Sequence, residues 1–297
     1  MLEGHEQMKA AQPAFPFTKM EGTGNDYIYV RASDLPRGLT EKALADLAAR
    51  ISDRHFGVGG DGLVLICPPS DPARADFRMR VFNSDGSEAQ MCGNASRCIG
   101  KYVYDKKMTT KTSVSLETLA GVKILDLRVE DDLVHSVRVD MGVPRLKPAE
   151  IPMHADGDSF INREIRVDGQ VYLGTAVSMG NPHLVLPVPD PDALDLTRLG
   201  PLFEHHPLFP ERVNTEFVTV VDRSHIRMRV WERGSGETLA CGTGACAAAV
   251  ACALNKLTDK RSVVHLRGGD LLLEWAENGT VYQSGPARHV FDGHYPY

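Results

Sequence analysis

The chain contains an internal repeat that predicts two copies of one structural unit. Residues 76–94 align without a gap on residues 225–243, about half of the 297-residue chain further on. Self-similarity at a fixed spacing is the signature of a repeated unit. Each copy runs from a strand pattern through a polar turn into a Cys-Gly pair that opens a helical pattern. The matched pairs are Arg78 and Arg227, Met79 and Met228, Arg80 and Arg229, Val81 and Val230, Glu88 and Glu237, Cys92 and Cys241, and Gly93 and Gly242.

The rest of each half is rich in short strand patterns separated by Gly, Asp and Pro, with few helical patterns between them. A helix is expected from Thr40 to Ile51, with Thr40 as its N-cap. Many short strands with few helices predict that each half is a curled sheet or barrel around one helix. The expected strands are 17–20, 27–30, 63–67, 77–83, 113–118, 122–130 and 133–141 in the first half, and 163–178, 183–188, 216–221, 226–232, 262–267 and 270–275 in the second.

The two helices that follow the Cys-Gly pairs differ in character. The helix after Cys241 is apolar on every face, so it is expected inside a barrel and buried all round. The helix after Cys92 is more amphipathic, and Lys101, Asp105 and Lys106 are expected to reach solvent.

These features predict the domain organisation of the chain. We expect residues 15–138 to form an N-terminal lobe around the first Cys-Gly helix, with residues 285–297 returning to it. Residues 139–284 are expected to form a C-terminal lobe around the second Cys-Gly helix. Residues 1–14 mix charge, Pro and Ala, and are interpreted as a disordered or tag-like extension.

Composition narrows the classes of partner. A net charge of −6 gives no basic excess, which disfavours nucleic acid and anionic membranes and favours a small metabolite. The longest apolar run, residues 245–254, is too short to span a bilayer. Six cysteines without a secretory signal predict reduced thiols and a cytoplasmic location.

Residues 57–62, Gly-Val-Gly-Gly-Asp-Gly, match the dinucleotide-binding fingerprint in their letters. That motif needs a strand before it and a helix after it. Here a helical pattern precedes it and a strand pattern follows, so the segment is better interpreted as a tight helix-to-strand connection that requires positive φ.

The cysteines do not predict a metal site. Cys92 with Cys98, and Cys241 with Cys246, lack the Cys-x-x-Cys spacing that brings two sulfurs to one ion, and no His pair has a complementary spacing. Cys98, Cys246 and Cys252 lie inside helical patterns and are interpreted as packing residues.

Cys92 and Cys241 differ from these because each lies at a helix start, where free N–H groups and the helix dipole favour negative charge. The pKa of a free thiol, about 8.5, falls to roughly 3.5–7.5 in such settings, so both thiols are expected to ionise easily. The N–H groups exposed by Gly93 and Gly242 would bind a substrate carboxylate. Two buried N-cap cysteines left from a duplication are the alternative, which the repetition of Cys-Gly disfavours.

Several other polar residues have no clear role from spacing alone. Asn83 and Glu232 occupy equivalent positions, each nine residues before a repeat cysteine. His183 and Glu232 could be ordinary hydrogen-bonded polar residues, and Asn25, Asn181 and Asn214 lie in turns, where Asn is common for backbone reasons.

Six motifs of residues 16–297 together resemble the diaminopimelate epimerase family, and they occur in that family's order. They are KMEGTGND, RHFGVGGDG, FNSDGSEAQMCGN-x-x-RC, SMGNPH, RVNTEF and ERGSGETLACGTGAC. The resemblance implies an α+β fold of two pseudo-symmetric lobes, each a β-barrel-like sheet wrapped around a central α-helix. It also implies a cofactor-independent, two-base epimerase that interconverts LL- and meso-diaminopimelate for lysine and peptidoglycan precursor synthesis, and a homodimer.

The resemblance also assigns residues to roles. Cys92 and Cys241 would be the acid-base pair, with His183 and Glu232 tuning their ionisation. Gly93, Asn94, Gly242 and Thr243 would hold the carboxylate at the reacting carbon. The substrate, mainly its distal end, would be bound by Asn25, Asn83, Asn181, Asn214 and Arg233, with Glu232 also in contact.

Two positions depart from the pattern of many family members. Ala95 stands where a second Gly is common, and Gly62 stands where some members have a substrate-contacting Gln. We expect the chemistry to be intact and the substrate fit to be slightly altered.

Two alternative functions remain open at the level of sequence. One is another racemase on the same scaffold, acting on histidine or proline. A monoamino acid would have no use for Arg233 together with Asn83, Asn181 and Asn214. The other is a thiol redox or binding protein, in which Cys92 and Cys241 form a reversible disulfide.

Overall fold

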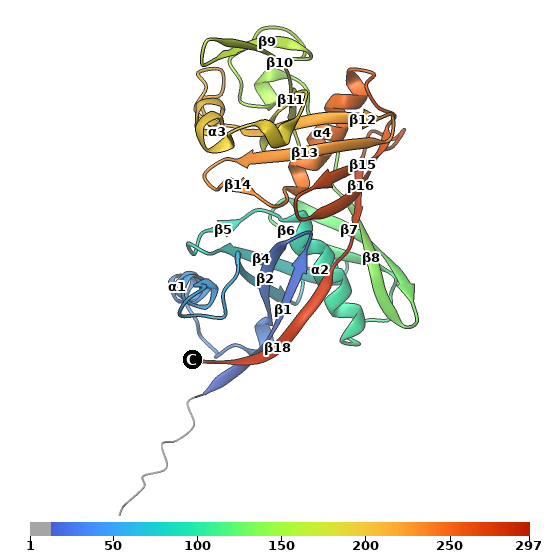
Figure 1. The fold of residues 1–297 in the computed structure, drawn as a ribbon. Helices are drawn as coiled ribbons and strands as arrows, with labels where there is room; N and C mark the ends of the chain where they lie inside the picture. The colour runs from blue at the N-terminus through green and yellow to red at the C-terminus, as the bar shows by residue number, and fades with distance from the viewer. Residues whose placement is uncertain (1–12) are drawn as a thin grey trace, which may run out of the picture.

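A computed structural model describes residues 13–297 and shows two lobes of strands stacked one on the other (Figure 1). The helices and strands of the lower lobe in that view are β1 (Ala14–Gly22), β2 (Asn25–Arg31), α1 (Glu41–Ser52), β3 (Gly62–Cys67), β4 (Phe77–Asn83), β5 (Glu88–Ala89), α2 (Gly93–Asp105), β6 (Ser113–Thr118), β7 (Gly121–Glu130), β8 (Leu133–Asp140) and β18 (Arg288–Pro296). The upper lobe contains β9 (Arg163–Val167), β10 (Gln170–Ser178), β11 (Pro182–Pro187), α3 (Leu196–Glu204), β12 (Asn214–Asp222), β13 (His225–Glu232), β14 (Gly236–Thr238), α4 (Gly242–Leu254), β15 (Arg261–Leu266), β16 (Gly269–Trp275) and β17 (Val281–Gly285).

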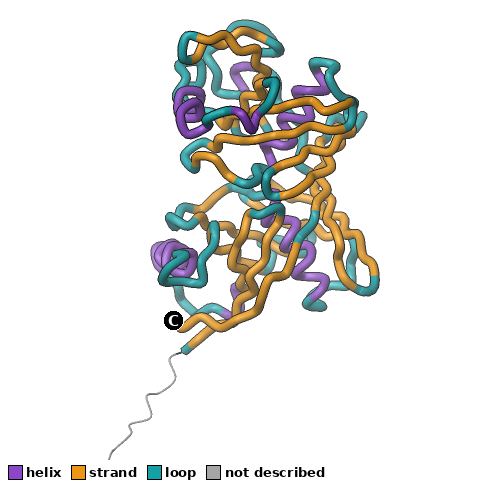
Figure 2. The backbone as a smooth tube through the Cα atoms, viewed as in Figure 1, coloured by secondary structure: helices purple, strands orange, loops and turns teal. Residues whose placement is uncertain are grey.

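Each lobe wraps its strands around one helix, so the predicted α+β fold of two similar barrel-like lobes is confirmed. Helix α2 packs against β1, β2, β4, β7 and β8, and α4 packs against β10–β13 and β15–β17. Figure 2 shows both helices enclosed by strands. As predicted, α4 is buried along nearly its whole length, from Gly242 to Cys252 apart from Thr243.

The two lobes repeat the same strand pairings. In the lower lobe β2 pairs with β3 and β4 with β6, both in parallel; in the upper lobe β11 pairs with β12 and β13 with β15, also in parallel. The repeat extends to a bidentate ion pair at equivalent positions. Arg80 Nε lies 2.8 Å from Glu88 Oε1, and Arg229 Nε lies 2.7 Å from Glu237 Oε1. Each ion pair links the long strand, β4 or β13, to the short strand that precedes the repeat cysteine, β5 or β14.

The sheets of the two lobes are continuous through one strand pairing. β17 of the upper lobe pairs antiparallel with β8 of the lower lobe, and Gln283 lies opposite Val139 there. The chain then enters β18, which pairs with β1 from Ala14 opposite Pro296 to Glu21 opposite Arg288. β17 therefore carries side chains of the upper lobe to the junction between the lobes, next to both central helices.

The predicted extension lies almost wholly outside the described residues, because residues 1–12 are not described and β1 begins at Ala14.

The predicted helix from Thr40 is confirmed as α1, and the Thr40 side chain accepts the Ala43 N–H at 3.2 Å. Helix α3 was not predicted; it contains Pro201, which interrupts the helical sequence pattern. Within residues 13–297, every helix is too short or too polar to cross a membrane.

The connection at residues 57–62 joins α1 to β3, as predicted from its glycines. Gly59 has a φ of +82°, which confirms the expected positive φ. A Cβ atom on Gly62 would lie 2.0 Å from the Phe82 carbonyl oxygen on the neighbouring strand. Because backbone occupies that space, a larger residue at this position would not fit here without a shift of the strand.

Candidate functional site

The two repeat cysteines are the N-caps of the two central helices. Cys92 Sγ accepts the Ala95 N–H at 3.4 Å, and Cys241 Sγ accepts the Gly244 N–H, also at 3.4 Å. Both cysteines have extended backbone, as an N-cap residue requires. The other N–H groups in the first turn of a helix have no acceptor within the helix and point out of its N-terminus. An anion is favoured at that end.

The N-termini of α2 and α4 meet around Gln283 and Asn94. A Cβ atom on Gly93 would lie 3.2 Å from Gln283 Oε1, and one on Gly242 would lie 3.1 Å from Gln283 Nε2 and 3.4 Å from Asn94 Oδ1. Gln283 also donates to the Gly242 carbonyl at 2.8 Å. Both Cys-Gly helix starts therefore border one small region at the junction of the lobes, where the buried Gln283 and Asn94 side chains pack against the two glycines.

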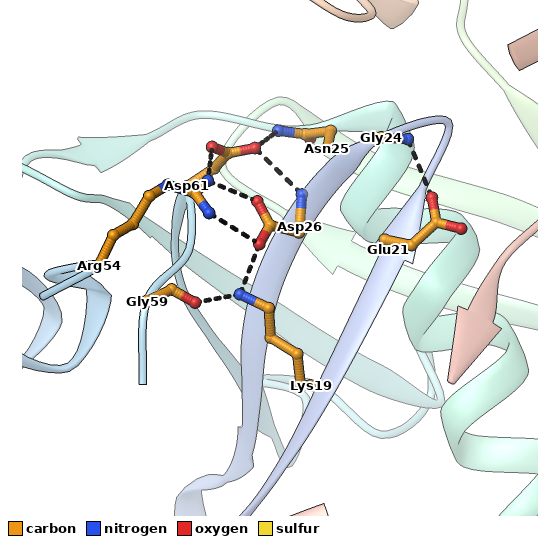
Figure 3. A network of polar contacts seen from close by, with 8 residues as sticks. All are labelled: Lys19, Glu21, Gly24, Asn25, Asp26, Arg54, Gly59 and Asp61. Carbon is orange, nitrogen blue, oxygen red and sulfur yellow. Dashed lines mark hydrogen bonds and ion pairs between the residues drawn. The ribbon is translucent and has the colours of Figure 1, made fainter. Parts of the chain in front are cut away.

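Asn25 lies beside Cys92 and is held in one orientation. Its Oδ1 lies 3.5 Å from Cys92 Sγ and accepts from Asn94 Nδ2 at 3.4 Å. Its Nδ2 donates to Asp61 Oδ2 at 2.5 Å (Figure 3). Because a carboxylate only accepts hydrogen bonds, Asp61 fixes which end of the Asn25 amide faces the thiol.

A series of ion pairs connects Asp61 to Arg54, Asp26 and Lys19 (Figure 3). Arg54 lies 2.9 Å from Asp61 and 2.7 Å from Asp26, and Lys19 lies 2.6 Å from Asp26. Burial acts to raise the pKa of Asp26, but hydrogen bonds and charge from Arg54 and Lys19 outweigh it and lower that pKa overall. Sequence reasoning missed Asp61 because it was interpreted only as part of the connection at residues 57–62.

Polar residues also connect Cys241 to the strand ends of the upper lobe. Thr243 Oγ1 lies 3.6 Å from Cys241 Sγ, and Asn181 Nδ2 donates to Thr243 Oγ1 at 3.3 Å. Asn181 Oδ1 lies 3.0 Å from His183 Nε2. The structure thus brings together the predicted residues Cys241, Thr243, Asn181 and His183.

Glu216 is a site residue that sequence reasoning missed. Its Oε1 lies 2.7 Å from His183 Nδ1, and both side chains are 0% exposed. A Cβ atom on Gly244 would lie 2.6 Å from Glu216 Oε1, so the carboxylate lies against the first turn of α4. The other oxygen, Oε2, has no hydrogen-bond partner among the described residues. The sequence contains one signal for this residue: Glu216 is a charged residue at the start of the mainly apolar segment 216–221.

Glu232 and Asn214 lie on neighbouring strands of the same lobe. Thr238 Oγ1 donates to Glu232 Oε1 at 2.5 Å. Burial raises the pKa of Glu232 overall, although hydrogen bonds from Thr238 and Cys241 act to lower it. Asn214 Oδ1 accepts the Arg233 N–H at 3.0 Å, and its Nδ2 donates to the Pro182 carbonyl at 2.7 Å.

Two predicted substrate contacts have other partners in this structure. The Arg233 guanidinium is exposed and donates to the Glu211 carbonyl at 2.9 Å. Asn83 lies at the end of β4, equivalent to Glu232 at the end of β13, but its Nδ2 donates to Ser87 Oγ of its own hairpin at 3.0 Å.

The expectation of easily ionised thiols is wrong for this structure. Burial raises the pKa of the Cys92 thiol, although the Ala95 N–H, Tyr27 and Arg97 each act to lower it. Burial also raises the pKa of Cys241 well above its ordinary value, and the charges of Glu232 and Glu216 add to this rise. The helix N–H groups act in the predicted direction, but they are outweighed by desolvation, which depends on tertiary packing.

The other cysteines have the packing environment predicted for them. Cys98, Cys246 and Cys252 are buried, and burial raises the pKa of each thiol to about 12. All six cysteines are free thiols in this structure. The described residues contain no group of three or more His, Cys, Asp or Glu side chains placed to hold a metal ion.

A family model described as diaminopimelate epimerase matches residues 17–147 and 175–290 of the chain. A diaminopimelate epimerase of Acetivibrio thermocellus is 55% identical over 278 residues, covering 93% of this chain and 97% of the relative. That of Desulfovibrio desulfuricans is 54% identical over 291 residues, covering 95% and 98%. That of Methanococcus maripaludis is 51% identical over 280 residues, covering 93% and 98%.

Two solved structures share the fold at much lower identity. A phenazine biosynthesis protein of the PhzF family from Bacillus anthracis superposes with a TM-score of 0.67 at 17% identity, covering 95% of this chain and 99% of that one. A hydroxyproline epimerase of Agrobacterium vitis, with bound trans-4-hydroxy-L-proline, gives 0.66 at 14% identity, covering 97% and 92%. At this identity the likeness extends to the fold alone.

Proposed function

The chain belongs to the diaminopimelate epimerase family, and we propose that it interconverts LL- and meso-diaminopimelate with Cys92 and Cys241 as the acid-base pair. The observation that carries this proposal is the meeting of two equivalent Cys-Gly helix N-termini around Asn94 and Gln283. One carbon held there would have a thiol on each side. The family relation, at 51–55% identity to the three relatives above, supports the substrate.

The reaction begins with removal of a proton from a carbon atom of very low acidity. The carboxylate next to that carbon takes up charge as the proton leaves, and the free N–H groups at the starts of α2 and α4 would bind it. Preorganised donors of this kind stabilise charge that develops in the transition state. The proposed donors are Gly93, Asn94, Gly242 and Thr243, so the stabilisation comes from both lobes at once.

The two thiols would act on opposite faces of the carbon. One cysteine, as thiolate, takes the proton, and the other, as thiol, returns a proton to the opposite face. Glu232 and Glu216 are close enough to Cys241 to raise its pKa, and they therefore favour its protonated form. His183 is fixed by Glu216 and would act on the same side. These proton transfers use only side chains and backbone of the chain itself.

Recognition of the distal amino-acid end is proposed for Asn25, Asn83, Asn181, Asn214 and Arg233. The bond from the Arg233 N–H to Asn214 Oδ1, at 3.0 Å, supports a shared role for these two residues. Its planar guanidinium suits bidentate binding of a carboxylate. In this proposal Arg233 gives up its hydrogen bond to the Glu211 carbonyl and binds the substrate instead. Asn83 likewise gives up its hydrogen bond to Ser87.

The setting of the enzyme is also a proposal. The reaction would supply meso-diaminopimelate for lysine and peptidoglycan precursor synthesis in the cytoplasm. A homodimer is proposed by analogy with the family. Sedimentation of the purified chain at several concentrations would test the assembly.

Incubation of the purified chain with LL-diaminopimelate in D₂O tests the proposed function. The expected result is formation of meso-diaminopimelate, detected by chiral chromatography, with deuterium at the epimerised carbon. A racemase for proline or histidine would instead exchange the α-proton of that amino acid. A redox protein would exchange no α-proton in any of these substrates, even when its thiols are shown by mass spectrometry to be reduced.

A further inference from the structure

Arg97 is a buried cation that has no carboxylate partner among the described residues. It lies on α2, its side chain is fully enclosed, and its residue is 0% exposed. Its three hydrogen bonds go to neutral acceptors: Gln283 Oε1 at 2.5 Å, Thr23 Oγ1 at 3.1 Å and the Pro286 carbonyl at 3.1 Å. Across residues 13–297, the ion pairs of the structure include none to Arg97. A buried charge without an opposite charge is costly, so its presence calls for a function.

The neighbours of Arg97 lead to both helix N-termini. Gln283 accepts from Arg97 through Oε1 and donates through Nε2 to the Gly242 carbonyl at 2.8 Å. Thr23 accepts from Arg97 and lies 3.5 Å from Asn94 Oδ1. One guanidinium is therefore connected, through one residue on each side, to the first turn of α2 and the first turn of α4.

The space around Arg97 is shaped for its guanidinium group. A Cβ atom on Gly22 would lie 3.3 Å from Arg97 Nη2, and one on Gly285 would lie 3.1 Å from Arg97 Nε. The ionisable groups that act most strongly on Arg97 are Cys98 of its own helix, the N-cap Cys92, Tyr29 of β2 and Cys246 of α4. Of these, Cys92 is the one that borders the meeting point of the helices.

We propose that Arg97 is a positioning residue whose buried charge, transmitted through Gln283 and Thr23, prepares both helix N-termini for the anionic substrate carboxylate. This inference rests on the proposed function. The counter-charge that Arg97 lacks would arrive with the substrate and grow as the α-proton leaves. A cation without a protein carboxylate beside it is available to that anion, whereas a cation paired with a protein carboxylate would already be neutralised.

Gln283 offers a test that separates this role from simple packing. Gln283→Glu would place a carboxylate on Arg97, with nearly the same shape, and neutralise it. Both Gln283→Glu and Gln283→Met lose the bond that Nε2 donates to the Gly242 carbonyl, and in Gln283→Glu an oxygen faces that carbonyl instead. If Arg97 only packs the core, the loss of activity in each variant should follow its loss of melting temperature. If Arg97 serves the carboxylate site, Gln283→Glu should be the more damaging change for catalysis.

The experiment measures kcat and KM for LL-diaminopimelate, and the melting temperature, in the full chain with each substitution. We expect Gln283→Glu to lower kcat/KM by about 10²–10³-fold, the effect of losing a preorganised charge-stabilising group. We expect Gln283→Met to lower it by about 10–100-fold, the cost of losing a group that orients a first contact. A Gln283→Glu enzyme as active as wild type, or no less active than Gln283→Met, would overturn the proposal.

Should Gln283→Glu not fold, Arg97→Lys and Arg97→Met replace it, with the exposed Arg128→Met as control. Arg97→Lys should keep at least about tenfold more kcat/KM than Arg97→Met, because it keeps a charge. Equal activity of these two variants would contradict the role of charge.

A separate measurement covers the case in which the wild-type chain does not epimerise diaminopimelate and the proposed function fails. The rate of Cys92 alkylation, compared between Arg97→Met and Arg97→Lys, then still tests the influence of the Arg97 charge on the thiol. The expected result is slower alkylation in Arg97→Met, and equal rates would overturn it.

Discussion

His183 and Glu216 form a fully buried pair, with 2.7 Å between the ring Nδ1 and the carboxylate Oε1. The pair fixes which ring nitrogen of His183 carries the proton toward Glu216, and it leaves Nε2 facing Asn181. Through Asn181 and Thr243 this arrangement reaches Cys241. A strand residue far from the cysteine motif thus orients the polar groups on one side of the proposed reaction site.

The first prediction concerns Glu216. Glu216→Ala leaves the buried Nδ1 of His183 without a partner, which should destabilise the fold by about 1–3 kcal/mol. It should also lower kcat/KM by about 10–100-fold, because His183 loses its orientation. Glu216→Gln keeps an acceptor of the same shape and is the matched control. Urea denaturation and epimerase kinetics measure the two effects. Equal losses in both variants would mean that the charge of Glu216, and not its hydrogen bond, matters.

The second prediction concerns the pKa of Cys241. The negative charge of Glu232 adds to the burial that raises this pKa, so Glu232→Gln should lower it. The alkylation rate of Cys241, followed against pH by peptide mass spectrometry, should therefore rise at a lower pH in the variant than in wild type. The alkylation profile of Cys92 serves as the internal control. A Cys241 profile that is unchanged or moves to higher pH would contradict this interpretation of Glu232.

The third prediction concerns the orientation of Asn25. Asp61→Asn introduces an amide that can donate as well as accept, so Asn25 is no longer held with Oδ1 toward Cys92. We expect kcat/KM to fall by about 10–100-fold with little change in melting temperature. Asp53→Asn, at an exposed carboxylate in the preceding turn, is the control. Full activity of Asp61→Asn would show that the orientation of Asn25 is set by other contacts.

The repeat in the sequence predicted the positions of the two central helices, because Cys-Gly with its preceding strand is a local pattern. The same pattern did not predict the pKa shifts of Cys92 and Cys241. The first turn of a helix is visible in sequence, but desolvation depends on which strands cover it. Arg97 lies inside the recognised motif after Cys92, yet its burial against Gln283 joins residues 186 positions apart.

Glu216 and Asp61 were missed for a related reason. Each acts through a second residue, Glu216 through His183 and Asp61 through Asn25. Such pairs join segments that are distant in the sequence, and the sequence leaves their relative positions open. Helix α3 was missed because Pro201 interrupts its pattern. The close packing at Gly62 also depends on strand register, since the Phe82 carbonyl occupies the place of a side chain.

The fourth prediction concerns Arg233 and the distal carboxylate. In the proposed complex the distal carboxylate and Arg233 bury each other, so Arg233→Met should reduce kcat/KM for diaminopimelate by the equivalent of about 2–5 kcal/mol, the cost of leaving a buried charge partner unpaired. The loss should lie mainly in KM, because the distal end takes no part in proton transfer. Arg166→Met, which changes an exposed arginine of β9, should leave both constants near wild type. An equal loss for diaminopimelate and for a monoamino acid would make Arg233 a structural residue.

The central claim is that Cys92 and Cys241 act on opposite faces of one carbon. Cys92→Ala and Cys241→Ala should each reduce epimerisation by at least the roughly 10²–10⁴-fold that one acid-base group contributes. Each variant keeps one thiol, so it should still exchange the α-proton of one epimer slowly without changing its configuration. The remaining thiol differs between the variants, so the epimer that exchanges should differ as well.

Deuterium incorporation from D₂O into LL- and meso-diaminopimelate, measured for both single variants by mass spectrometry with chiral separation, tests this claim most directly. The control is wild type, which should label and epimerise both substrates. The account predicts that the two variants label opposite epimers and that neither inverts the carbon at an appreciable rate. Labelling of the same epimer by both variants, or near-normal epimerisation by either, would contradict it.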